Sequence, residues 1–150
     1  SWFVRGLSHM KGGTLEDAIG DFTRAIELKP SWPEAYVNRG VCRYRKKDFA
    51  AAIEDHTQAI RFSPKHALAH FNRAAAKVEL QDYAGAREDY TRALEERPNH
   101  ADSHFWRALC RDKLGDRPGA VADLEAALKC APPNWPSRGE AETHLKQLRR

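Results

Sequence analysis

A 34-residue repeat is the feature of this sequence that most constrains its fold. Four similar segments read GDFTRAIELKP, EDHTQAIRFSP, EDYTRALEERP and ADLEAALKCAP, and each starts 34 residues after the one before, at Gly20, Glu54, Glu88 and Ala122. A second set of motifs (VRG, NRG, NRA, WRA) keeps the same step and is centred on Arg5, Arg39, Arg73 and Arg107. Such regularity indicates an array of stacked units, each packing mainly on its neighbours.

Each unit is expected to be a pair of antiparallel helices. In the second unit we predict helices over 34–46 and 49–62, joined by a turn at Lys47-Asp48, with matching turns at Gly12-Gly13, Gln81-Asp82 and Gly115-Asp116. The second helix of each unit carries two alanines seven residues apart, on one face. Small residues let two helices approach closely, and the bulky residue between them is expected to fill the gap: Phe22, His56, Tyr90 and Leu124. A proline then ends each unit: Pro30, Pro64, Pro98 and Pro132.

This pattern resembles the tetratricopeptide repeat (TPR) family, which shares the period of 34, the small–large–small order on the second helix and the closing proline. The resemblance implies an all-α fold, a right-handed α-solenoid of four helix-turn-helix repeats over residues 1–32, 33–66, 67–100 and 101–134. In residues 135–150, Ser137 is expected to cap a final helix whose Ala141, Leu145 and Leu148 cover the last repeat. The first repeat starts inside its first helix, so we expect the chain to be a piece of a longer protein.

Charge and cysteine content narrow the function classes. The chain has 25 basic and 21 acidic residues, a net charge of +4, and its basic excess lies in the Arg43–Lys47 run and the C-terminal tail. A nucleic-acid groove usually needs a basic stripe along its whole face, so nucleic acid is a disfavoured partner, with RNA binding kept as an alternative. The three cysteines form no paired spacing, which favours a reducing, intracellular and cytoplasmic setting. No apolar stretch is long enough to predict a membrane span.

Four arginines depart from the family pattern, which is usually apolar at that point. Each precedes an aspartate by 16 residues, a spacing that places the two side chains opposite each other in an antiparallel hairpin. We therefore predict a structural ladder of Arg–Asp pairs near the core, whose effect is on specificity of packing more than on net stability. The pairs are Arg5–Asp21, Arg39–Asp55, Arg73–Asp89 and Arg107–Asp123.

The resemblance also implies a concave groove lined by the first helices, which would bind a peptide or helix of a partner protein. The residues expected there are Val37, Asn38, Val41, Tyr44, Arg45, Leu68, Phe71, Asn72, Glu79, Asp102, Phe105, Trp106 and Lys113, together with Phe3, Val4, Leu7, Met10, Glu34, Ala75 and Leu109. Asparagine both donates and accepts hydrogen bonds, so it suits a peptide backbone. Packing against neighbouring helices is the alternative role for Phe71 and Phe105.

Some TPR domains hold the acidic tails of heat-shock chaperones with a carboxylate clamp of two lysines, an arginine and two asparagines. Counted from the first repeat, the clamp positions here hold Phe3, Leu7, Asn38, Leu68 and Asn72. Counted from the second, they hold Val37, Val41, Asn72, Asp102 and Trp106. Only the central asparagine is retained in either frame, so we predict no clamp binding.

Catalytic, cofactor and metal motifs are missing from the sequence. His66 and His70 are four residues apart, as are His100 and His104, but no third ligand stands at a recognisable spacing and no metal site is predicted. We therefore expect neither an enzyme nor a small-molecule substrate. Self-association through the uncapped Trp2–Phe3 end remains a third possible function.

Overall fold

The computed structural model describes residues 1–150 and consists of nine α-helices. Their bounds are α1 Trp2–Gly12, α2 Leu15–Leu28, α3 Pro33–Arg45, α4 Phe49–Phe62, α5 Ala67–Glu79, α6 Tyr83–Glu96, α7 Ala101–Lys113, α8 Arg117–Cys130 and α9 Arg138–Leu148. The predicted helix over 49–62 is therefore confirmed, while the helix predicted over 34–46 begins and ends one residue earlier. Pro33 is its first residue, a position where proline loses no helical hydrogen bond.

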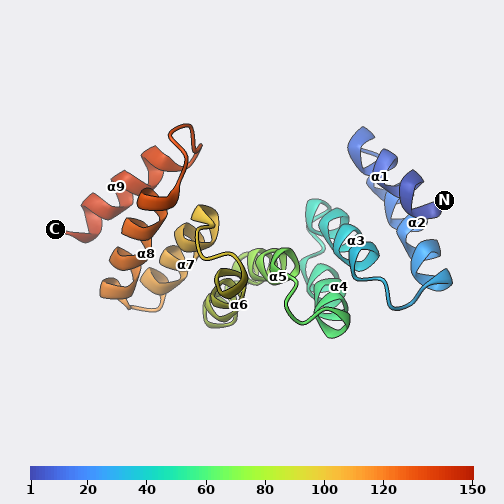
Figure 1. Ribbon diagram of the computed structural model, residues 1–150, viewed down its shortest axis with the longest axis horizontal. Helices are drawn as coiled ribbons and strands as arrows, with labels where there is room; N and C mark the ends of the chain where they lie inside the picture. The colour runs from blue at the N-terminus through green and yellow to red at the C-terminus, as the bar shows by residue number, and fades with distance from the viewer.

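The helices pair into hairpins that stack into an arc (Figure 1). The hairpins are α1 with α2, α3 with α4, α5 with α6 and α7 with α8, and the second helix of each also packs on the first helix of the next. The first helices α1, α3, α5 and α7 lie on the inner side of the arc, and the N- and C-termini lie at its opposite ends. The all-α solenoid predicted from the sequence is thus the observed fold.

Left-handed residues form the turns inside the hairpins. Gly13 and Gly115 have φ of 84°, while Lys47 and Gln81 take the same region at 65° and 63°. A positive φ ends one helix and reverses the chain, and it costs a non-glycine residue roughly 1 kcal/mol. The following residue then starts the second helix, and in three hairpins its carboxylate accepts from a backbone N–H of the first turn: Asp48, Asp82 and Asp116.

Small residues form the seam of each hairpin. The first alanine of each seven-residue pair is fully buried, and so is the bulky residue that follows it, as expected: Ala18, Ala52, Ala86 and Ala120. In the first two repeats a glycine faces the bulky ring. A Cβ on Gly40 would stand 2.7 Å from Cε1 of His56, and one on Gly6 would stand 2.8 Å from Cε1 of Phe22. These glycines are therefore required by the approach of the two helices.

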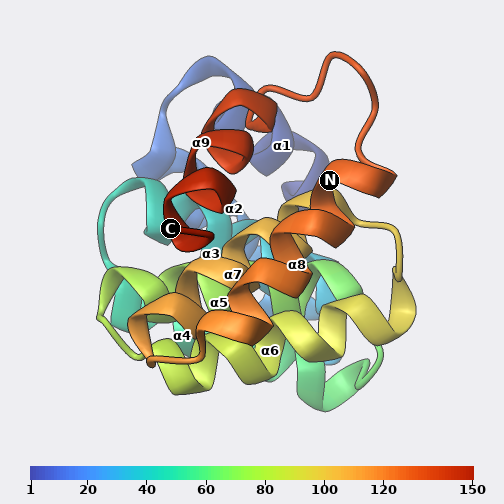
Figure 2. The same ribbon diagram turned by 90° about the vertical axis from the view of Figure 1, so that its left-hand side faces the viewer.

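The last helix closes the C-terminal end of the array, which faces the viewer in Figure 2. Ala141, Leu145 and Leu148 of α9 are buried in one cluster with apolar residues of α7 and α8, so these three have the covering role expected of them. Trp135, which the sequence reasoning overlooked, joins this cluster, and its indole N–H donates to Asp102 at 2.8 Å. Ser137 does occupy the N-cap position, but its side chain makes no capping hydrogen bond, because its backbone has already turned to φ −90° and ψ 7°.

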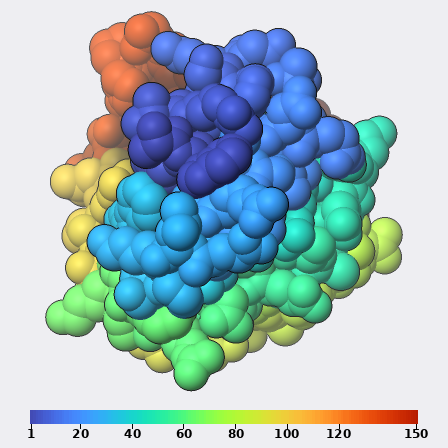
Figure 3. All heavy atoms as spheres, turned by 90° about the vertical axis from the view of Figure 1, so that its right-hand side faces the viewer, coloured from blue at the N-terminus to red at the C-terminus, as the bar shows by residue number.

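The N-terminal repeat forms the other end of the array, and Figure 3 views it directly. Phe3 packs on the Phe22 ring of the same hairpin, with centroids 5.7 Å apart, and on Trp32, which precedes α3. Trp2 is 38% exposed and lies under the guanidinium of Arg5. None of the nine helices is long and apolar enough to cross a membrane.

Candidate functional site

The structure brings each of the four ladder arginines to the aspartate sixteen residues later. In every pair, Nη2 of the arginine lies 2.7 Å from Oδ1 of the aspartate: Arg5–Asp21, Arg39–Asp55, Arg73–Asp89 and Arg107–Asp123. The aspartate side chains are only 3–4% exposed, and three of the arginines are 15–18% exposed. Arg5 differs, because its side chain is 57% exposed at the open end of the array. These residues fasten one helix of each hairpin to the other, outside the concave groove.

Each ladder aspartate has a further basic partner, one turn along the first helix from the arginine. Lys77 Nζ lies 2.9 Å from Asp89, Arg43 and Arg111 make the equivalent contacts at 2.9 Å, and His9 lies 2.7 Å from Asp21. These contacts hold the pKa values of Asp21, Asp89 and Asp123 below the ordinary value of an aspartate. Burial alone raises the pKa of Asp89, but hydrogen bonds from His70, Arg73 and Lys77 outweigh burial and leave the pKa well below its usual value.

Threonines link the ladder from one repeat to the next, a feature that the sequence reasoning missed. Nη1 of Arg39, Arg73 and Arg107 donates to a threonine hydroxyl of the preceding hairpin at 3.1–3.2 Å: Thr23, Thr57 and Thr91. Each threonine precedes its arginine by 16 residues, and each arginine precedes its aspartate by 16 residues. The sequence therefore shows the same spacing twice in a row, and this signal could have identified the threonines. The guanidinium thereby connects three successive helices.

The histidine pairs have structural partners within the fold. His70 and His104 bond through Nε2 to the backbone carbonyls of Pro64 and Pro98 at 2.9 and 2.8 Å. His66 caps α5 by accepting from Ala69 N, and His100 bonds to Ser103 Oγ at 2.6 Å. All four rings thus hold the ends of helices, and no group of three potential metal ligands is formed.

The basic run at the end of α3 is partly neutralised. Arg43 is bound to Asp55, and Lys46 is paired with Glu16 of the preceding hairpin. Arg45 lies on the inner face and donates to the carbonyl of Met10 at 3.4 Å. The run therefore leaves few free cations, which weakens the case for tracking a phosphate backbone.

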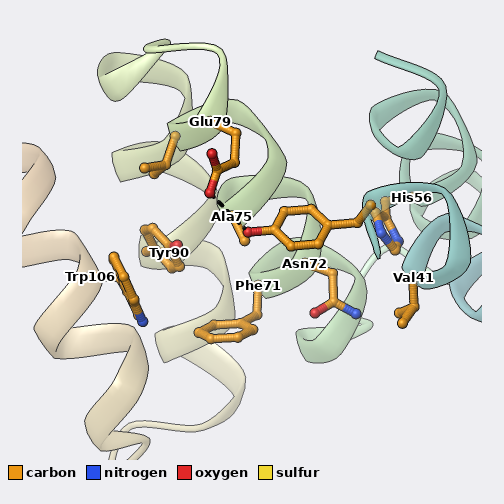
Figure 4. Close-up of a pocket in the computed structure, with 10 residues that line it drawn as sticks. Val41, His56, Phe71, Asn72, Ala75, Glu79, Tyr90 and Trp106 are labelled. Atoms are coloured by element: carbon orange, nitrogen blue, oxygen red, sulfur yellow. Dashed lines mark hydrogen bonds between the residues drawn. The ribbon is translucent and has the colours of Figure 1, made fainter. Parts of the chain in front are cut away.

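A hollow of about 290 Å³ lies on the inner face of the array, at its centre (Figure 4). The first helices α3, α5 and α7 form its walls, and the bulky seam residues His56 and Tyr90 of α4 and α6 contribute from behind them. Seven residues expected in the groove line it, with Val78 beside them: Val41, Tyr44, Phe71, Asn72, Ala75, Glu79 and Trp106. His56 and Tyr90 were overlooked because their helix-seam pattern predicted packing alone.

Two residues expected in the groove are buried and unavailable to a partner. Val37 is 4% exposed, because it packs into a core cluster with Tyr36, Ala59 and Ala69. Phe105 is fully buried, because Trp106 and Trp135 pack edge-on against its ring at 5.4 and 5.8 Å. Val37 therefore does not face a partner as expected, and Phe105 has its alternative role, packing against neighbouring helices.

Four further residues expected in the groove lie on α3, α5 and α7 but do not line the hollow. Leu68, at 43% exposure, stands at the start of α5, and Asn38 donates to Glu34 O within α3. Asp102 is held by the Trp135 indole, and Lys113 is exposed at the end of α7. The central part of the expected groove is thus an apolar hollow with a polar surround.

The polar groups of the hollow are mostly unpaired. Among its ten lining residues a single hydrogen bond forms, from the Tyr44 hydroxyl to Glu79 Oε1 at 3.2 Å. His56 is 1% exposed, and its Nδ1 has no hydrogen-bond partner. Burial, with a smaller contribution from the charge of Arg73, lowers the pKa of His56 to about 4, so the ring is neutral at pH 7. Buried polar atoms normally find partners, so the unpaired Nδ1 of His56 is an exception that lies beside the hollow.

One protein family matches the sequence over most of its length. The sequence profile of the tetratricopeptide repeat family matches residues 3–67 and 71–134. A bovine (Bos taurus) relative, the Protein SGT1 homolog, is 34% identical over 47 residues, which are 31% of this chain and 14% of that protein. The chain thus spans a small part of that relative's length.

Solved structures share the arc of helical hairpins. The crystal structure of MamA is 22% identical with a TM-score of 0.83, over 86% of this chain and 75% of that one. MamA from Desulfovibrio magneticus RS-1, from its residue 41 to the end, gives 0.89 at 15% identity, over 98% and 81%. The first TPR of Spaghetti (RPAP3), bound to the HSP90 peptide SRMEEVD, gives 0.75 at 28% identity, over 76% and 90%.

Proposed function

Because the chain belongs to the tetratricopeptide repeat family, we propose that it is a non-catalytic scaffold that binds a peptide or helix of a partner protein in its concave groove. The observation that carries this proposal is the hollow on the inner face, walled by aromatic and aliphatic side chains from three successive repeats. Large apolar anchors in a partly desolvated pocket are what protein interfaces use for most of their binding energy.

Two lining residues are suited to the central contact. Trp106 is 37% exposed although it is large and apolar, and exposed tryptophans of this kind are enriched among interface residues that dominate affinity. Asn72 lies between Phe71 and Val41 (Figure 4), where its amide could pair with both a donor and an acceptor of a peptide backbone. The groove therefore offers both an apolar anchor and a means of holding a main chain.

We further propose that the groove does not accept chaperone tails by the carboxylate clamp. The RPAP3 domain was solved with the acidic peptide SRMEEVD, but here Leu68 and Asp102 occupy positions where the clamp needs basic side chains. Glu79 adds a carboxylate to the hollow itself. A peptide rich in acidic residues would therefore meet like charge and apolar surface, which disfavours binding.

Selection of peptides from a random phage-displayed library tests the proposal. Peptides retained by the wild-type array should lose binding to an Asn72→Ala, Trp106→Ala variant by at least about tenfold, since removing a central anchor costs 1–2 kcal/mol or more. A matched control is the Trp2→Ala, Asn99→Ala variant, which removes the same residue types outside the hollow, Trp2 being as exposed as Trp106. Peptides that bind both variants equally well, or that need Trp2, would refute binding in the groove.

A further inference from the structure

The central hollow has a net negative character in a protein with a net positive charge. The chain carries +4, yet Glu79 is the one lining residue of the hollow with a formal charge at neutral pH, because His56 is neutral there. The nearest ladder cation, Arg73, is neutralised by Asp89 at 2.7 Å. A positively charged group entering the hollow would thus meet a carboxylate and no opposing free cation in its lining.

Aromatic rings form much of the remaining lining. Four of the lining rings come from four different helices: Tyr44, Phe71, Tyr90 and Trp106. Figure 4 shows Phe71, Tyr90 and Trp106 below Glu79. Phe71 and Tyr90 pack edge to face, with centroids 5.6 Å apart, which fixes the orientation of both rings. The face of an aromatic ring carries negative potential and attracts a cation within about 6 Å of its centre.

The unpaired polar atoms of the hollow favour an entering side chain that donates hydrogen bonds. A neutral imidazole has one ring nitrogen that accepts, and neither ring nitrogen of His56 is bonded to another lining residue. The carbonyl oxygen of Asn72 and the hydroxyl oxygen of Tyr90 also accept. Glu79 retains one carboxylate oxygen beyond the one that Tyr44 occupies. Asn72 and Glu79 can therefore receive hydrogen bonds from an entering side chain, while His56 and Tyr90, each 1% exposed, form the back of the hollow.

The size of the hollow limits what can enter. At about 290 Å³ it lies at the lower end of the range for small-molecule pockets, so it suits one long side chain more than a cofactor. Val41, Ala75 and Val78 supply aliphatic contacts for the stem of such a side chain. A long stem with a planar, donor-rich cation at its tip matches all of these features, and arginine has five N–H donors and no acceptor.

We propose that the hollow takes an arginine side chain of the partner segment, with its guanidinium between the aromatic rings and Glu79. This specificity rests on the proposed function, since it names the residue by which a groove-bound segment is anchored. It gives the array a charge preference opposite to that of a carboxylate clamp. Lysine shares the charge but presents three donors at a point, so it would fit less well.

A titration with single amino-acid probes tests the hollow directly, without an identified partner. N-acetyl-arginine methylamide is added to the full chain, and the indole N–H signal of Trp106 is followed by NMR after assignment with a Trp106→Phe variant. The citrulline counterpart has the same shape without the charge. We expect saturable shifts with arginine and binding at least about fivefold weaker with citrulline, from the lost charge and cation–π contacts.

Glu79→Gln should weaken binding of the arginine probe by about threefold to tenfold, as expected for a partly exposed charge contact. It should also reduce the preference of the hollow for the arginine probe over the citrulline probe. Glu88→Gln is the control, because it changes net charge equally at an exposed position of α6. Equal binding of arginine and citrulline, tighter binding of the norleucine or lysine counterpart, or equal effects of the two glutamine variants would overturn the proposal. Peptides selected in the groove without arginine would overturn it too, and would leave the groove function standing.

Discussion

Arg39 and Asp55 are joined across their hairpin by hydrogen bonds from Nε and Nη2 of the guanidinium, at 3.1 and 2.7 Å. The remaining side of the same guanidinium donates to Thr23 of the preceding repeat at 3.2 Å. One side chain therefore fixes both the geometry within a repeat and the stacking between two repeats. The arrangement recurs with Arg73 and Arg107, so each of the four hairpins is linked to its neighbour by such a guanidinium.

The first prediction concerns the loss of one partner from this ladder. Asp55→Asn leaves the guanidinium groups of Arg39 and Arg43 without their anion, although Arg39 is only 15% exposed. Breaking a buried ion pair in this way typically costs about 3–5 kcal/mol. We expect a loss of that order in the free energy of unfolding, measured by urea denaturation.

Replacing both partners with apolar residues should cost less than replacing one. The double variant Arg39→Met, Asp55→Leu removes the unpaired charge of Arg39, so part of the loss should be recovered. Glu125→Gln provides a surface control, since its pair with Arg149 is more than half exposed and worth at most about 1 kcal/mol. If Asp55→Asn is no more harmful than Glu125→Gln, the ladder has no structural importance.

The second prediction concerns the seam between α3 and α4. Gly40→Ala would place a Cβ 2.7 Å from the ring of His56, which is buried at the seam, so that either the ring or the two helices must shift. Overpacking of this kind costs about 1–3 kcal/mol. Gly20→Ala is the matched change, because it lies within α2 and meets nothing within 4 Å. There the gain in helix propensity, up to about 1 kcal/mol, should stabilise the chain.

Thermal unfolding of the two glycine variants therefore should move in opposite directions. A Gly40→Ala variant as stable as the wild type would mean that the helices separate freely at this seam. The comparison also controls for the general effect of alanine on the unfolded chain.

The third prediction is a pH dependence caused by His56. Its pKa is about 4 in the folded protein, against 6.5 for an ordinary histidine, chiefly because of burial, with Arg73 and His66 lowering it and Asp89 opposing them. Between pH 6.5 and 4 this histidine is protonated in the unfolded chain but stays neutral in the folded chain. The free energy of unfolding therefore decreases as the pH drops from 6.5 to 4. The loss from this residue approaches about 3 kcal/mol.

His56→Phe should remove this contribution, because Phe22 fills the same position against Gly6 in the first repeat. The variant and the wild type are compared by urea unfolding at pH 7, 5.5 and 4.5. The ladder aspartates with lowered pKa, such as Asp89, act in a different window, since their stabilisation is lost only as the pH falls below about 4. An unchanged slope between pH 6.5 and 4.5 in His56→Phe would contradict the assignment.

Periodicity was sufficient for most of the fold. The 34-residue step and the small–large–small pattern identify the eight repeat helices, and the turn positions follow from the glycines and their equivalents, since both features are local. The spacing of 16 residues also indicates which arginine meets which aspartate, because a hairpin of two helices with a short turn fixes that geometry.

The groove was harder to predict because the position of a residue along its helix does not determine how deeply its side chain is buried. Val37 and Phe105 share the inner-helix register with exposed residues, yet neighbouring helices cover them. Trp135 lies in the connection before α9, where no periodic pattern applies, and its contact with Asp102 spans 33 residues. The part that His56 and Tyr90 take in the hollow likewise depends on how three hairpins stack, which no single repeat encodes.

Affinity capture from a cell lysate tests the central claim, that the concave groove binds a partner protein, most directly. The wild-type array is compared with the Asn72→Ala, Trp106→Ala variant and the Trp2→Ala, Asn99→Ala control, once circular dichroism shows that all three are folded. Our account predicts one or more proteins retained by the wild type and the control and lost from the groove variant. Retention of the same proteins by the groove variant would contradict it and would place the binding surface elsewhere.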